Sequence, residues 1–133
     1  MRPLTVRVAT EADGSKVVFV QAKAETGTLW LELDSGNNGS TYLAPQAIKQ
    51  LGITLPKGEK ASVQLQLAGF GEVPVVARRR TMIYDGQLGI GMISKFVWTI
   101  DLKTSRAWIK PEKQKYSDVA PKGSKTGRMM GQG

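Results

Sequence analysis

Apolar and polar residues alternate along several short segments of this chain, with the period of two that a half-buried strand requires. The clearest example is residues 29–33, in which three leucines alternate with Trp30 and Glu32. The same alternation, or a run of β-branched residues, recurs in residues 5–10, 17–20, 63–67, 73–83, 96–102 and 107–109. Turn-forming residues separate most of these segments. The pattern predicts seven to nine strands and an all-β fold.

One segment departs from the strand pattern and carries the punctuation of a helix. Pro45 suits the first helical position, and Gly52 suits the position after the last one. Between them Ala47, Ile48 and Leu51 share one helical face. The sequence therefore predicts one short helix on a small closed β-barrel.

Composition limits the chemistry that this chain can perform. It has 133 residues, which suits one domain, and it contains no histidine and no cysteine. Zinc hydrolases, Cys-His peptidases and Ser-His-Asp hydrolases need those side chains, so none of them can be assembled from this chain alone. We expect no metal and no cofactor, and carboxylates remain the candidates for acid-base work.

The chain is basic, with a formal net charge of +8, and half of that excess lies from Lys110 onward. A basic module could bind nucleic acid through Arg78, Arg80 and the Lys-rich tail. Consecutive arginines in a strand alternate between its faces, however, which is more typical of a solvated sheet surface. Nucleic acid is therefore not the expected partner.

The candidate for chemistry is Asp34, at the end of the alternating segment and followed by Ser35 and Gly36. These three residue types are also common in turns, where the Asp carboxylate accepts backbone N–H bonds. The triplet alone is weak support for a function. Its position among the other features carries more information.

The order of these features resembles the retropepsin-like and pepsin-like aspartic peptidases over about residues 17–109. A strand of alternating leucines leads into Asp34-Ser35-Gly36, a short helix ends in Leu51-Gly52, and Leu88-Gly89 precedes a Phe- and Trp-containing strand. Residues 85–89 ahead of that strand are also typical of bacterial relatives. The resemblance implies a closed acid-protease-like barrel and an aspartic-type endopeptidase that acts on peptides or proteins.

The resemblance also implies roles for the residues of the loop. Asp34 would be the catalytic carboxylate, Ser35 would bond the partner loop across a twofold axis, and Gly36 would let a backbone N–H approach the carboxylate. Asn37 stands where the family commonly has Ala, Ser or Thr, so it would either donate to the carboxylate or crowd it.

A second pair of residues, Leu88 and Gly89, has a structural role in the same resemblance. It matches the family's hydrophobic-hydrophobic-Gly element, which packs beneath the loop that holds the catalytic carboxylate. The same dipeptide would also serve as an ordinary packing contact at the end of a strand.

An aspartic peptidase needs two carboxylates, and no other Asp in this chain is followed by Ser-Gly or Thr-Gly. The second Asp would come from a second copy of the chain or from another lobe of the same fold. Only about nine residues separate Gly52 from the strand near Ser62, too few for the long flap hairpin of retropepsins. This feature favours a flapless second lobe, and a noncatalytic module for interaction and dimerisation would share it.

The domain is expected to span residues 1–115, because apolar residues thin out after Pro111. Residues 116–133 are expected to form a flexible basic tail. No apolar run approaches the ~20 residues that cross a bilayer, and the first residues do not resemble a signal peptide. A membrane partner is not expected, and the compartment stays open.

Overall fold

The fold is described from a computed structural model that covers residues 2–34 and 39–112. In chain order the elements are β1 (Arg2–Leu4), β2 (Val6–Thr10), β3 (Lys16–Ala24), β4 (Gly27–Leu33), β5 (Thr41–Leu43), α1 (Pro45–Leu51), β6 (Lys60–Leu67), β7 (Gly71–Arg79), β8 (Gly86–Leu88), α2 (Ile90–Ile93), β9 (Phe96–Asp101) and β10 (Arg106–Pro111).

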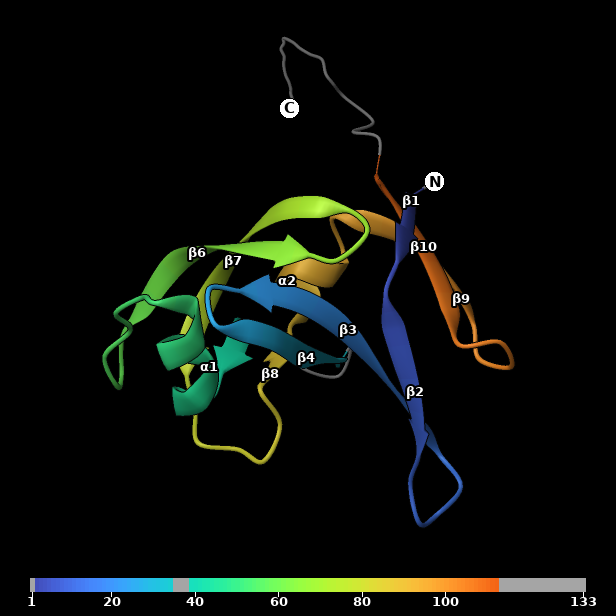
Figure 1. The fold of residues 1–133 in the computed structure, drawn as a ribbon, viewed down its shortest axis with the longest axis horizontal. Helices are drawn as coiled ribbons and strands as arrows, with labels where there is room; N and C mark the ends of the chain where they lie inside the picture. The colour runs from blue at the N-terminus through green and yellow to red at the C-terminus, as the bar shows by residue number, and fades with distance from the viewer. Residues whose placement is uncertain (1, 35–38, 113–133) are drawn as a thin grey trace, which may run out of the picture.

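Six of the strands close into a barrel. The larger sheet has the order β2-β3-β4-β8-β5-β7-β6, and a further pairing between β3 and β6 joins its ends. Strand β2 lies outside this ring as the antiparallel neighbour of β3. A separate three-stranded sheet, β1-β10-β9, lies beside the barrel on the right of Figure 1. The predicted all-β closed barrel is confirmed.

The barrel interior is filled by the apolar residues that the alternation assigned to one face. In β4 Leu29 and Leu31 are buried, while Trp30 and Glu32, which alternate with them, are only partly covered. The fully buried leucines are Leu29, Leu31, Leu43, Leu65, Leu67 and Leu88. They come from four strands of the ring, so one core holds the barrel together.

Helix α1 begins and ends as its sequence predicts. Pro45 is its first residue, and Gly52 adopts a left-handed conformation (φ 70°) at its C-terminal cap. The backbone N–H of Gly52 donates to carbonyls of the last turn, which satisfies groups that a helix end leaves unpaired.

The prediction of one helix is wrong, because residues 90–93 form the second short helix α2. Two glycines within four residues, Gly89 and Gly91, lower the helix propensity of this segment, so the sequence did not predict a helix there. The strand count is also higher than predicted, because β1, β5 and β8 are three residues long and show no alternation of their own.

Residues 52–59, between α1 and β6, contain turns and no strand. The predicted absence of a long hairpin in this segment is therefore confirmed. The predicted tail, residues 116–133, lies outside the described residues. In the part of the chain that the structure describes, no helix is long and apolar enough to cross a membrane.

Candidate functional site

Asp34 follows β4 directly and is held against β8. Strands β4 and β8 are parallel, with Leu31 opposite Gly86 and Leu33 opposite Leu88. The backbone N–H of Asp34 donates to the carbonyl oxygen of Leu88 at 3.3 Å, which extends the pairing by one residue. This bond fixes the backbone that carries the carboxylate.

The predicted element Leu88-Gly89 packs against the chain that follows the loop. Leu88 is fully buried in the barrel core. A Cβ atom built on Gly89 would lie 2.5 Å from the carbonyl oxygen of Gly39 and 2.7 Å from that of Ser40. Only glycine allows this close backbone approach, so Gly89 lies directly against the segment beyond the loop.

Thr41 secures the same contact and was missed by sequence reasoning. It is the buried polar residue of the described structure, with 2% exposure. Its Oγ1 accepts a hydrogen bond from the backbone N–H of Gly89 at 3.3 Å. A threonine beside an Asn-, Gly- and Ser-rich segment looks like a loop residue, and nothing in its spacing marks it as buried.

A glycine also permits close packing at the start of β8. A Cβ atom on Gly86 would lie 2.4 Å from the carbonyl oxygen of Tyr42. Asp85, which precedes it in an Asp-Gly turn, accepts a bond from the backbone N–H of Trp30 through Oδ2 at 2.9 Å. Asp85 therefore joins the loop before β8 to β4 and has a structural partner.

The predicted roles of Ser35, Gly36 and Asn37 fall on residues outside the described part of the chain. In the described part of the chain, no three carboxylate, His or Cys side chains are grouped as metal ligands.

Polar and aromatic side chains cover the barrel face next to Asp34. Trp30 and Glu32 alternate away from the core in β4, the strand that ends one residue before Asp34. Gln87, opposite Glu32 on β8, donates from Nε2 to Glu32 Oε1 at 2.7 Å. Tyr42 lies opposite Gln87 on the next strand. We call Trp30, Glu32, Tyr42 and Gln87 the site face.

Two arginines pack over the aromatic rings of the site face. The guanidinium of Arg7 lies 4.4 Å from the centre of the Trp30 ring, and that of Arg80 lies 4.9 Å from the centre of the Tyr42 ring. Such cation–π contacts orient both partners. Arg80 therefore has a packing role that its place in Arg78-Arg79-Arg80 did not reveal.

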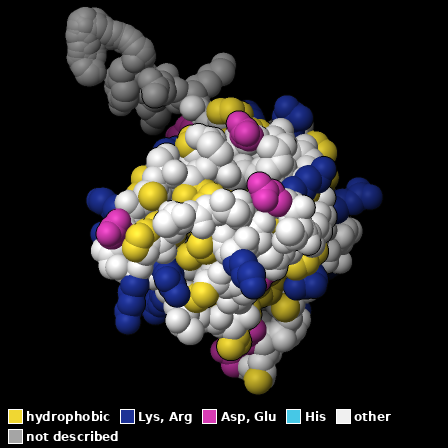
Figure 2. All heavy atoms as spheres, turned by 60° about the vertical axis from the view of Figure 1, so that its left-hand side comes forward, with side chains coloured by type: hydrophobic (Ala, Val, Ile, Leu, Met, Phe, Trp, Pro, Cys, Tyr) yellow, Lys and Arg dark blue, Asp and Glu magenta, His cyan; other side chains and the backbone are white. Residues whose placement is uncertain are grey.

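Two carboxylates, one of them from the site face, act on Tyr84. The carboxylate of Glu11, then partial burial and the carboxylate of Glu32, raise the pKa of Tyr84 above its ordinary value. Elsewhere, Lys and Arg side chains are dispersed over the face in Figure 2 and do not form a continuous stripe. This dispersion agrees with a solvated basic surface.

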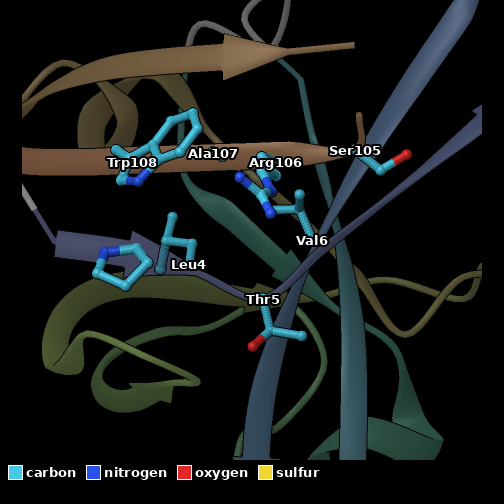
Figure 3. A pocket seen from close by; sticks show the side chains of 8 residues that line it. Leu4, Thr5, Val6, Ser105, Arg106, Ala107 and Trp108 are labelled. Atoms are coloured by element: carbon cyan, nitrogen blue, oxygen red, sulfur yellow. The ribbon is translucent and has the colours of Figure 1, made fainter. Parts of the chain in front are cut away.

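Two hollows flank the small sheet. One, of about 460 Å³, lies where the chain passes from β1 to β2 and faces β10 (Figure 3). Arg106 is the charged residue that lines this hollow, and the other lining residues are apolar or carry a hydroxyl group. Asp34 and its neighbours do not line it, and we assign no chemistry to it.

The second hollow, of about 300 Å³, lies next to the candidate site because Leu33 forms part of its wall. Its lining residues are Lys16, Val18, Leu33, Ile93, Trp98 and Ile100. The Trp98 side chain is fixed there by a 2.8 Å bond from its Nε1 to the carbonyl oxygen of Ile93. Apolar surface therefore extends from β9 to the residue before Asp34.

No family model and no curated protein matches the sequence. The solved structures that share the fold include the following two. The retroviral protease-like domain of Ddi1 from Leishmania major is 16% identical with a TM-score of 0.54, over 77% of this chain and 96% of that domain. A retropepsin-like aspartic protease from Rickettsia conorii is 16% identical with a TM-score of 0.51, over 83% of this chain and 96% of that protein. The chain therefore has a retropepsin-like fold.

Proposed function

We propose that this retropepsin-like barrel is half of an aspartic endopeptidase, in which Asp34 and a second Asp, from another copy of the chain or from another lobe of the same fold, hydrolyse peptide bonds in a peptide or protein substrate. The observation that carries the proposal is the position of Asp34. It directly follows β4 and its backbone N–H is bonded to Leu88, the residue before Gly89, which packs against Gly39 and Ser40, within a fold shared with an aspartic protease.

The chemistry of such a pair follows from electrostatics. Two carboxylates about 3 Å apart cannot both ionise easily, so they share one proton over a wide pH range. The ionised member takes a proton from the attacking water, while the protonated member polarises the substrate carbonyl. This mechanism needs neither histidine nor cysteine, and the chain has neither.

The site face gives the proposed substrate its surroundings. Trp30 and Tyr42, each with an arginine packed over its ring, offer aromatic and cationic groups, and the linked side chains of Glu32 and Gln87 offer hydrogen-bonding groups on the two strands that lead to Asp34 and Gly89.

The test is cleavage of an unstructured protein between about pH 3 and pH 7, followed by mass spectrometry of the products. The wild type should cleave best in acid, because activity requires the shared proton. Asp34→Asn should abolish cleavage, and Asp13→Asn, which changes an exposed turn residue of the same type, should leave it intact. Equal cleavage by the wild type and Asp34→Asn would refute the proposal.

A second candidate function is a noncatalytic module that keeps the fold for interaction and dimerisation. The turns of residues 52–59 favour it, because this segment has no hairpin to cover a bound substrate. This candidate predicts that the protein dimerises but cleaves no substrate at any pH. Cleavage that depends on Asp34 would eliminate it.

A further inference from the structure

Strand β2 has one edge without a partner strand. In the part of the chain that the structure describes, β2 pairs only with β3. Figure 1 shows β2 diverging from the β9–β10 hairpin after the turn that joins it to β1. An unpartnered edge presents a row of backbone N–H and C=O groups, which can pair with another extended chain.

Backbone bonds at both ends of the β2–β3 ladder show which groups of β2 face outward. The N–H of Gln21 donates to the carbonyl oxygen of Thr5 at 2.9 Å, and the N–H of Glu11 donates to the carbonyl oxygen of Ser15 at 2.8 Å. Both pairs continue the register of the ladder, in which bonded and non-bonded pairs alternate. The odd-numbered residues of β2 therefore bond to β3, and the even-numbered residues turn their N–H and C=O groups away from it.

The outward groups belong to Val6, Val8 and Thr10, each of which offers one donor and one acceptor. Natural edge strands are commonly protected from pairing by a charge, a proline or a bulge. The single charged residue of β2 is Arg7, and its guanidinium lies 4.4 Å from the centre of the Trp30 ring on β4. Because that guanidinium reaches across β3, it leaves the outer edge of β2 open.

The hollow of about 460 Å³ adjoins the first residue of this edge. Thr5 and Val6 line it from one side and Arg106 from the other, and Figure 3 shows the Arg106 side chain pointing from β10 toward Val6. Asp101 lies opposite Arg106 on β9, but its Oδ1 already accepts two backbone bonds from its own turn. An extended chain that passes Val6 along β2 enters this hollow, where the guanidinium can bind a carboxylate.

We propose that the free edge of β2 binds an extended segment of a partner protein as an added antiparallel strand, with acidic side chains of that segment beside Arg106. Antiparallel pairing is the more stable arrangement, and it directs the C-terminal end of the added strand to Val6 and the hollow. The formal charge of +8 also attracts an acidic partner at long range. Asp34 does not form this edge, so the inference is independent of the proposed function.

The pairing pattern determines which side chains of the partner face which way. Residues that lie opposite each other in an antiparallel pair place their side chains on the same face. Val6 and Val8 share a face with Val18 and Val20 of β3, so the partner's residues opposite them should be apolar. These are also the partner residues whose N–H groups bond to β2. The predicted partner sequence therefore alternates apolar and polar residues and ends in acidic ones.

The first experiment measures binding of a fluorescein-labelled, C-terminally amidated peptide, Thr-Val-Thr-Val-Thr-Val-Glu-Glu, by fluorescence anisotropy. It should bind saturably, and a peptide with both glutamates moved to its N-terminal end should bind at least fivefold more weakly. A dissociation constant above about 1 mM, or equal binding of the two peptides, would overturn the proposal.

The second experiment tests the backbone bonds with two N-methylated forms of the same peptide. Methylation of the three valine nitrogens removes the donors that face β2, so binding should be lost. Methylation of the three threonine nitrogens removes donors that face solvent, so most of the binding should remain. Equal loss from both forms would overturn the pairing geometry on which the proposal depends.

The third experiment tests the contact with Arg106. Arg106→Gln should weaken binding of the peptide about fivefold, and it should not weaken binding of a peptide with glutamine in place of both glutamates. Arg79→Gln makes the same change at an exposed residue of β7, which does not pair with β2, and it should leave binding unchanged. Equal effects of the two substitutions would overturn the proposal.

The fourth experiment changes the edge itself. Val8→Pro removes one outward N–H at a position where an edge strand tolerates proline, and it should weaken peptide binding about tenfold. Thermal unfolding by circular dichroism checks the fold, and light scattering should give the same molar mass as for the wild type. Unchanged binding by the folded variant would overturn the proposal. A changed molar mass would also overturn it, because the edge would then bind a second copy. Asp34→Asn should bind the peptide like the wild type.

Discussion

The packing of Gly89 against the segment beyond the site loop leads to a quantitative prediction. In Gly89→Ala the new Cβ would lie 2.5 Å from the carbonyl oxygen of Gly39, whereas ordinary van der Waals contact begins at 3.4 Å. The 2.7 Å approach to the carbonyl of Ser40 blocks a simple sideways escape. The backbone of one segment must therefore move by several tenths of an ångström.

The cost can be worked from two opposing effects. Overpacking a close contact costs about 1–3 kcal/mol, and two backbone oxygens put this site near the upper end. Replacing glycine with alanine lowers the conformational entropy of the unfolded chain, which stabilises the folded state by about 0.4–1 kcal/mol where alanine can adopt the native backbone conformation. Gly89 has φ −89° and ψ 169°, which alanine adopts without strain. The expected net loss is about 2 kcal/mol.

Urea unfolding followed by tryptophan fluorescence measures this loss. With a slope of about 1.5 kcal/mol per molar, the midpoint should fall by about 1.3 M. The matched control is Gly91→Ala, where the nearest atom to the new Cβ is the same Gly39 oxygen at an ordinary 3.7 Å. Gly91 is within α2, so alanine there should leave the midpoint unchanged or raise it. A midpoint for Gly89→Ala within about 0.3 M of wild type would refute the packing argument.

Three other predictions test the core, a turn and a carboxyl group. Leu31→Ala should destabilise the fold by about 2–5 kcal/mol in thermal unfolding, because Leu31 is fully buried, whereas Leu102→Ala at an exposed position should change stability by less than about 0.5 kcal/mol. Ser105 has φ 55°, a left-handed conformation that costs free energy for any residue with a Cβ atom. Ser105→Gly should therefore stabilise the fold by up to about 1 kcal/mol and raise the melting temperature slightly. An unchanged or lower melting temperature would contradict this. The hydrogen bond from the Thr104 side chain is the main cause that lowers the pKa of Asp101. Desolvation opposes it, and backbone bonds from Thr104 and Lys103 and the charge of Arg106 add to the lowering. Since the folded pKa is lowered, this contribution to stability is fully present above the unfolded pKa of about 3.9 and is lost as the pH falls through the folded value. An NMR titration of the Asp101 carboxyl checks the direction, and Thr104→Ala should bring its pKa back toward the ordinary value.

Sequence reasoning found the parts of this fold that local chemistry determines. The alternation of Leu29, Leu31 and Leu33 identified β4 and its buried face, and Pro45 and Gly52 identified both ends of α1. These patterns are reliable because the structure that each one favours depends mainly on residues that are close together in the sequence.

The features that sequence reasoning missed depend on distant segments. Strands β5 and β8 have three residues each, and their pairing is decided by the barrel that they complete. The burial of Thr41 follows from its bond to Gly89, which is 48 positions away. Asp85 looked like an ordinary turn residue, yet its carboxylate binds the backbone of Trp30, which is 55 positions away. Such long-range contacts leave no periodic trace in the sequence.

The closure of the barrel has a consequence for how the protein opens. Strands β3 and β6 are joined by only two residue pairs, Ala22 with Leu67 and Lys23 with Gln66. Just beyond them the backbone of Ala68 donates to Gln21 and accepts from Thr5, so one residue ties the N-terminal strands to the end of β6. The hairpin of β6 and β7 is held by eight residue pairs of its own. The β3–β6 junction is therefore, like the two-pair junction of β5 and β8, a weak point of the ring. Its amide hydrogens should exchange with solvent through partial opening, while those of the hairpin should stay protected until the whole domain unfolds.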